Sequence, residues 1–187
     1  MSRNEKIEQV RCSTQEIIIA RTDTKGKIIY YNPTFSKVHG IEGAELIHES
    51  EELFRHPDMP QAIFQIVSSI LEQGLSIQAV VKNKTLDGKY YWSLVSWEAQ
   101  RDMDDNIISF VMRGKQAPDK VINTMEPLYK IMTNIEEEHD LESSLAFLHA
   151  HLDEEGVTYS QYMNKLTKNR EFRCLCDFVT HSILGKN

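Results

Sequence analysis

Residues 77–114, which read IQAVVKNKTLDGKYYWSLVSWEAQRDMDDNIISFVMRG, contain three strand-like runs joined by two turn sequences. The runs Ile77–Lys84, Tyr90–Ala99 and Ile107–Gly114 are rich in the β-branched and aromatic residues that favour strands. An Asp-Gly pair separates the first two runs and an Asp-Asp-Asn sequence separates the last two, which is typical of tight turns. This stretch therefore predicts two consecutive antiparallel hairpins.

Two further strands and a set of helices are expected on the N-terminal side of these hairpins. The β-branched runs at 17–20 and 28–31 predict a first hairpin. Short helices are expected after Pro33 and over Glu42–Ile47, and apolar residues at helical spacing predict a longer amphipathic helix over 61–73. The order of elements predicts an α+β fold in which a five-stranded antiparallel sheet carries helices on one face.

The composition changes at Pro118, where strand-forming residues give way to charged and aliphatic residues at helical spacing. We therefore expect a first unit over 14–117 and a C-terminal helical segment over 118–187. The helices expected in this segment cover Val121–Glu138, Leu141–Leu152 and Tyr159–Asn169. An apolar stripe that includes Leu128 and Met132 can pack on the sheet, within the helical segment or on a partner chain.

Charge and composition exclude several classes of protein. The net charge of −7 comes without a basic patch, which argues against binding nucleic acid. The longest apolar run is far short of the ~20 residues that a membrane span needs, so no membrane insertion and a cytoplasmic location are expected. The three cysteines, Cys12, Cys174 and Cys176, indicate no disulfide framework and no metal site. Because no catalytic motif is present, we expect no enzyme and no catalytic residues.

A spread-out set of residues resembles the PAS family over residues 14–117. The set is Asp23-x-x-Gly26-x-Ile28-x-x-x-Asn32-x-x-Phe35, then Gly40, Glu45-Leu46 and the hairpin from Asp87-Gly88 to Trp92. Within it, Arg55-His56-Pro57-Asp58-Met59-Pro60, followed by Val81-Lys82-Asn83 and Tyr91-Trp92, is similar to the subfamily found in bacterial aerotaxis and energy-taxis receptors. The resemblance implies a PAS fold, with the five-stranded sheet described above.

The resemblance also implies a cofactor, flavin adenine dinucleotide (FAD), held without a covalent bond between the sheet and the long helix. The cofactor-binding residues that it implies are Asn32, Arg55, His56, Asp58, Asn83 and Trp92. Such residue types suit the task, since a guanidinium can pair with a pyrophosphate, amides and carboxylates can bind a ring edge, and an indole can stack on a flat ring.

Each of these residues also has a structural interpretation. Asn32 can cap the helix that follows Pro33, and Trp92 can belong to the core. Arg55, His56 and Asp58 can form a local ion-paired loop. The sequence differs from the subfamily at Ser68 and Ile77, where related proteins often carry tryptophan. Haem b bound through His56, or no cofactor at all, therefore remain alternatives to FAD.

The functional hypothesis is a cytoplasmic sensor of redox or energy state, of the aerotaxis type, that binds flavin and signals through protein–protein contact. The expected partner is a membrane-bound chemoreceptor or transducer, or another signalling protein, and the chain is expected to form a homodimer. The alternative is a PAS scaffold or dimerisation module for a chemoreceptor that has no cofactor or binds haem.

Overall fold

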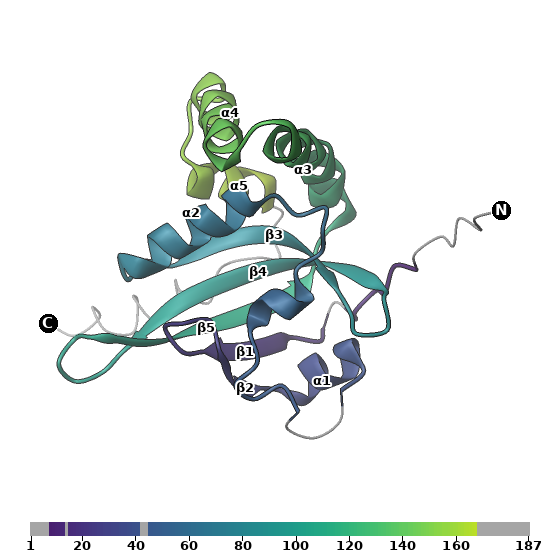
Figure 1. Cartoon of the computed structure of the whole chain (residues 1–187), viewed down its shortest axis with the longest axis vertical. Coiled ribbons are helices and arrows are strands. Elements are labelled where there is room, and N and C mark those ends of the chain that lie inside the picture. Colours follow the sequence, from purple (N-terminus) through teal and green to yellow (C-terminus); the bar gives the residue numbers. More distant parts are fainter. Residues whose placement is uncertain (1–7, 14, 42–44, 168–187) are drawn as a thin grey trace, which may run out of the picture.

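A five-stranded antiparallel sheet forms the centre of the protein in a computed structural model, which describes residues 8–13, 15–41 and 45–167 (Figure 1). The strand order is β2-β1-β5-β4-β3. The strands are β1 (Ile18–Thr22), β2 (Ile28–Tyr31), β3 (Ile77–Lys84), β4 (Tyr90–Arg101) and β5 (Ile107–Gln116). The five predicted strands and their antiparallel arrangement are confirmed, and the last two strands extend beyond the predicted ends.

The two predicted hairpins of residues 77–114 form as expected. In the first, Lys84 pairs with Tyr90 beside a turn in which Gly88 has φ +83°. A positive φ is strained for residues with a Cβ atom, so the turn favours glycine here. Strand β1 pairs with β5, so the first and the last strand in the sequence are neighbours in the sheet.

Helices α1 (Pro33–His39) and α2 (Gln61–Glu72) and the 3-10 helix η1 (Glu51–Phe54) lie on one side of the sheet. Two details differ from the sequence prediction. The helix expected over Glu42–Ile47 lies partly outside the described residues, and 45–48 form a turn. The 3-10 helix η1 was not predicted, and the Ser50 side chain caps it by accepting a hydrogen bond from Glu52 N.

The tail helices α3 (Asp119–Glu138), α4 (Leu141–Glu154) and α5 (Tyr159–Thr167) pack beside α2 and the β3 edge of the sheet (Figure 1). Strand β5 ends at Gln116 and α3 begins at Asp119, on either side of the boundary expected at Pro118. Nevertheless the tail and the sheet share one hydrophobic cluster, in which Met125, Tyr129 and Met132 are almost completely buried. The Tyr129 hydroxyl also donates a hydrogen bond to Val80 O at 2.8 Å. The stripe of α3 is therefore internal core.

The last part of the sequence, 168–187, lies outside the described residues. Cys174 and Cys176 belong to it, as does the end of the last predicted helix, Asn169.

Candidate functional site

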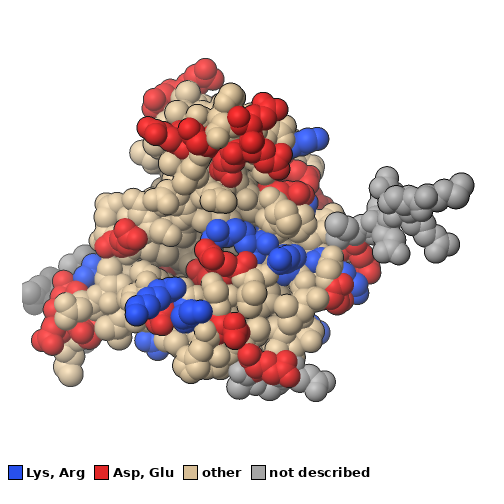
Figure 2. Space-filling view, in the orientation of Figure 1, with Lys and Arg blue, Asp and Glu red and all other residues tan. Residues whose placement is uncertain are grey.

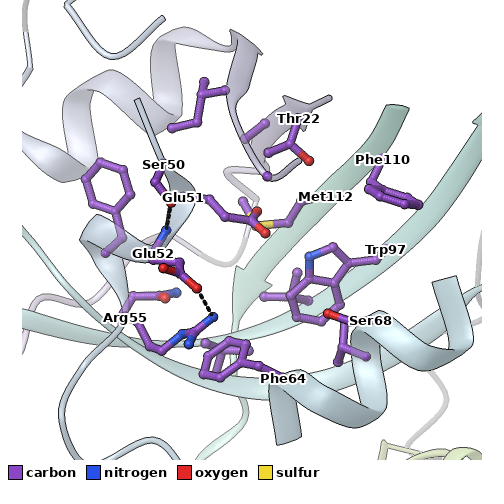
Figure 3. A pocket seen from close by; sticks show the side chains of 18 of the residues that line it. Thr22, Ser50, Glu51, Glu52, Arg55, Phe64, Ser68, Trp97, Phe110 and Met112 are labelled. Carbon is purple, nitrogen blue, oxygen red and sulfur yellow. Dashed lines mark hydrogen bonds and ion pairs between the residues drawn. The ribbon is translucent and has the colours of Figure 1, made fainter. Parts of the chain in front are cut away.

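A cavity of about 410 Å³ opens between the sheet and helices α1, η1 and α2 (Figure 3). Ligand sites for small molecules commonly measure roughly 300–1,000 Å³ and combine apolar walls with a few polar groups. The walls here fit that description. The apolar and aromatic part includes Ile28, Phe64, Trp97, Phe110 and Met112.

The alternation of β4 decides which of its side chains reach the cavity. Tyr91, Val95 and Trp97 line it, whereas Trp92 has the opposite orientation and stacks on Tyr129 of α3, with ring centroids 6.3 Å apart and planes 22° apart. The expectation that Trp92 stacks on a ligand in this cavity is therefore corrected. Trp97, five residues further along β4, supplies an indole to the cavity wall instead (Figure 3).

Arg55 and Asn83 both line the cavity and lie next to each other, because their backbones form an isolated antiparallel bridge. The Arg55 guanidinium lies 3.9 Å from the ring centroid of Phe64, and its Nη2 is 3.3 Å from Oε1 of Glu52. Its Nε–H is buried and has no hydrogen-bond partner in the described part of the chain. Since an unpaired buried donor costs free energy, a ligand that accepts from it would bind favourably.

His56 and Asp58 do not line the cavity, although they flank Arg55 in sequence. His56 Nδ1 accepts a hydrogen bond from Asp58 N at 3.1 Å, and Asp58 Oδ2 lies 2.5 Å from Lys82 Nζ. Burial and the positive charge of Lys82 lower the pKa of His56. These contacts attach the segment to β3, so both residues are corrected from cavity ligands to supports. Since His56 does not line the cavity, it is not placed to be the axial ligand of a haem bound there.

Asn32 also lies outside the cavity lining, and its side-chain amide makes three hydrogen bonds to the backbone. Its Oδ1 accepts from the backbone N–H groups of Phe35 and Ile19, each at 3.0 Å, and its Nδ2 donates to Ile17 O at 2.8 Å. Asn32 thus caps α1 and ties it to β1, which is the structural alternative considered for it.

His39 and Tyr91 form a buried pair in the cavity wall that the sequence analysis missed. The backbone carbonyl of Phe35 can only accept, so His39 Nδ1–H donates to it at 2.9 Å and Tyr91 O–H donates to His39 Nε2 at 3.1 Å. Burial lowers the pKa of His39 to about 4, which keeps the ring neutral near pH 7. No sequence motif joins the two residues, since α1 and β4 meet only in the fold.

Glu51 is a second cavity residue without a signal in the sequence. Its side chain points into the cavity from the start of η1 (Figure 3). The side chain is exposed to water in the open cavity. The protein atoms around the carboxyl nevertheless desolvate it in part, which raises its pKa to about 7. An acid with such a pKa is neutral or ionised depending on conditions close to physiological pH.

Two other kinds of site find no candidate in the part of the chain that the structure describes. There, no group of three or more His, Cys, Asp or Glu residues is placed to hold a metal ion. None of the helices described is long and apolar enough to span a membrane.

Comparison with known proteins agrees with this fold. The family model for the PAS fold matches residues 12–117, and the chain belongs to that family. Over 115 residues the chain is 30% identical to the aerotaxis receptor of Escherichia coli (strain K12), an alignment that covers 62% of this chain and 22% of the receptor. The chain therefore corresponds to a minor part of that relative.

Solved structures of low sequence identity share the fold. A light-oxygen-voltage domain from work with a flavin analogue is 19% identical with a TM-score of 0.54, and covers 67% of this chain and 90% of its own. The dark structure of the blue-light photoreceptor Aureochrome1 LOV is 21% identical with a TM-score of 0.50, and covers 64% and 86% respectively. At this identity the two structures bear on the fold alone.

Proposed function

We propose that this PAS protein is a cytoplasmic sensor of redox or energy state that binds FAD in the cavity and signals through protein–protein contact. Its similarity to an aerotaxis receptor supports the sensory role, and the resemblance of its motifs to the aerotaxis subfamily implies the flavin. When bound, a flavin supplies reversible uptake of electrons and protons. The protein would bind and orient it, and report its state.

The unpartnered Nε–H of Arg55 is the observation on which this proposal rests. A buried guanidinium donor in the wall of an aromatic cavity suits an anionic or carbonyl acceptor on a flat heterocycle. Asn83 lies beside it and adds an amide that can both donate and accept. Trp97, Phe64 and Phe110 offer aromatic surface to the ring. The residues present therefore fit a flavin.

The segment from Glu51 to Pro60 provides a route from the cavity to the tail helices. Its Arg55 lines the cavity, while its Asp58 carbonyl accepts a hydrogen bond from Thr133 of α3 at 3.3 Å. Ligand contacts that displace Arg55 would therefore alter how this segment packs against α3. A change in that packing would serve as the output signal, because a ligand shifts an equilibrium between two arrangements when it binds one of them better.

The proposed partner is a membrane-bound chemoreceptor or transducer, contacted through the tail helices, with homodimer formation by the chain itself. Acidic side chains gather over α3 and α4 in Figure 2, which makes this face of the tail predominantly negative. Such a surface favours a partner with a complementary basic patch and would make their association sensitive to salt.

Purification followed by visible spectroscopy tests the ligand directly. We expect bound flavin in the wild type, and we expect Arg55→Ala to weaken flavin binding by roughly ten- to hundredfold, because charge-assisted hydrogen bonds contribute about 1.5–3 kcal/mol. Arg113→Ala is the matched control, since Arg113 pairs with Glu98 at 2.8 Å outside the cavity lining. Protein that binds no flavin would favour the cofactor-free scaffold, and full flavin affinity in Arg55→Ala would refute the role of Arg55.

A further inference from the structure

The carboxyl of Glu51 stands in the cavity without a fixed partner. The backbone of Glu51 is held by a hydrogen bond from Glu51 N to Gly26 O at 3.1 Å. The carboxyl lies next to Gly26, where a Cβ atom would be 4.0 Å from Glu51 Oε1. None of the described residues forms a hydrogen bond or ion pair with the carboxyl, and the nearby Arg55 pairs with Glu52 instead. Access to water is therefore an important source of stability for the ionised form.

The charged and titratable groups around Glu51 come from several elements. On its own segment, the positive charge of Arg55 lowers the pKa of Glu51 and the negative charge of Glu52 raises it. His39 of α1 and Tyr91 of β4 face the cavity as neutral groups at pH 7. The other lining residues that carry charge are Lys25 of the β1–β2 turn and Glu72 of α2. Their opposite signs leave no dominant cation to hold Glu51 ionised.

We propose that Glu51 couples occupation of the cavity to proton binding, so that an uncharged ring enters together with one proton that Glu51 takes up. The inference rests on the proposed function, because it takes a flavin ring as the occupant. A ring that fills the cavity displaces water from the carboxylate, and desolvation favours the neutral acid. The acid also gains an O–H that can donate to a ring carbonyl, which a carboxylate cannot do.

The coupling has a defined direction and needs no redox step. The proton moves from solvent to a carboxylate oxygen of Glu51, no electrons are exchanged, and the ring stays uncharged. Binding then weakens as the pH rises, since ionised Glu51 must first be protonated. A sensor built in this way would report proton concentration through its occupancy, in addition to the state of the ligand.

Riboflavin titrations at several pH values test the coupling, because riboflavin carries the ring without the phosphate charges of FAD. For the wild type we expect the Kd to rise about tenfold between about pH 6 and about pH 8. Glu51→Gln should show a constant Kd close to the wild-type value at the lower pH. Glu49→Gln, which removes the same charge at an exposed position outside the cavity lining, should keep the wild-type dependence. Calorimetry in two buffers of different ionisation enthalpy should show uptake of about one proton at the higher pH in the wild type alone.

The outcomes separate this inference from the proposed function. Riboflavin binding that is independent of pH in the wild type, or that keeps its pH dependence in Glu51→Gln, overturns the coupling and leaves the flavin site standing. Loss of binding by Glu51→Gln at every pH also overturns it, since Glu51 would then act as an ionised acceptor. Absence of riboflavin and FAD binding by the wild type at every pH overturns the flavin site, and the coupling falls with it.

Discussion

Helix α2 begins without a side-chain cap of its own, and a carboxylate from the tail supplies the missing acceptors. Pro60 occupies the N-cap and makes no capping hydrogen bond. Glu136 of α3 accepts from Gln61 N at 2.8 Å and from Ala62 N at 2.9 Å. Its negative charge also lies at the positive end of the helix dipole. Replacing Glu136 by alanine should therefore lower the free energy of unfolding by about 1–2 kcal/mol.

Urea denaturation measures this loss. With an m-value of about 2 kcal/mol/M, within the range usual for small proteins, the transition midpoint should fall by roughly 0.5–1 M with m unchanged. Glu137→Ala removes the same charge from an exposed position on the same helix and should shift the midpoint little. Glu136→Gln keeps one acceptor oxygen without the charge, so its midpoint should lie between those of Glu136→Ala and Glu137→Ala. Equal midpoints for Glu136→Ala and Glu137→Ala would refute the capping argument.

The same variant tests the proposed route from cavity to tail. Phe64 and Val67 of α2 line the cavity, so the cap connects α3 to a helix that would contact the ligand. If the two sites are coupled, Glu136→Ala should weaken flavin binding, and Glu137→Ala should leave it unchanged. Identical flavin affinity in both variants would show that this cap contributes to stability alone.

Two further predictions concern the core and its pH dependence. Met132→Ala should lower the free energy of unfolding by about 2–5 kcal/mol, because Met132 is fully buried between tail and sheet. Ile131→Ala, at an exposed position on the same helix, should lower it much less. Similar losses of stability for the two variants in thermal unfolding would contradict the shared core. The pKa of His39 is lowered to about 4 in the folded protein from about 6.5, so unfolding takes up a proton between these values and stability should fall as the pH drops from about 6.5 towards 4. His39→Gln should reduce this fall, and an unchanged acid-unfolding profile would count against a neutral buried His39.

Local patterns were sufficient to predict most of the secondary structure. Strand composition and turn residues act over a few positions, and they correctly predicted the hairpins of residues 77–114. The apolar spacing over 61–73 likewise predicted α2. The error around 45–48 and the missed η1 concern short segments, where hydrogen bonds to neighbouring elements outweigh local preference. One such bond joins Glu51 N to Gly26 O.

The sequence by itself determined the strands, the amphipathic helices and the resemblance to PAS domains, because each depends on residues that are close in sequence or on a motif. Only the tertiary structure decided which side chains face the cavity. Trp92 and Trp97 lie on the same strand with similar local composition, but α3 covers one face of β4 and the cavity opens on the other. The cap that Glu136 gives to Gln61 spans 75 residues. Such choices depend on how distant elements pack, and no local pattern encodes them.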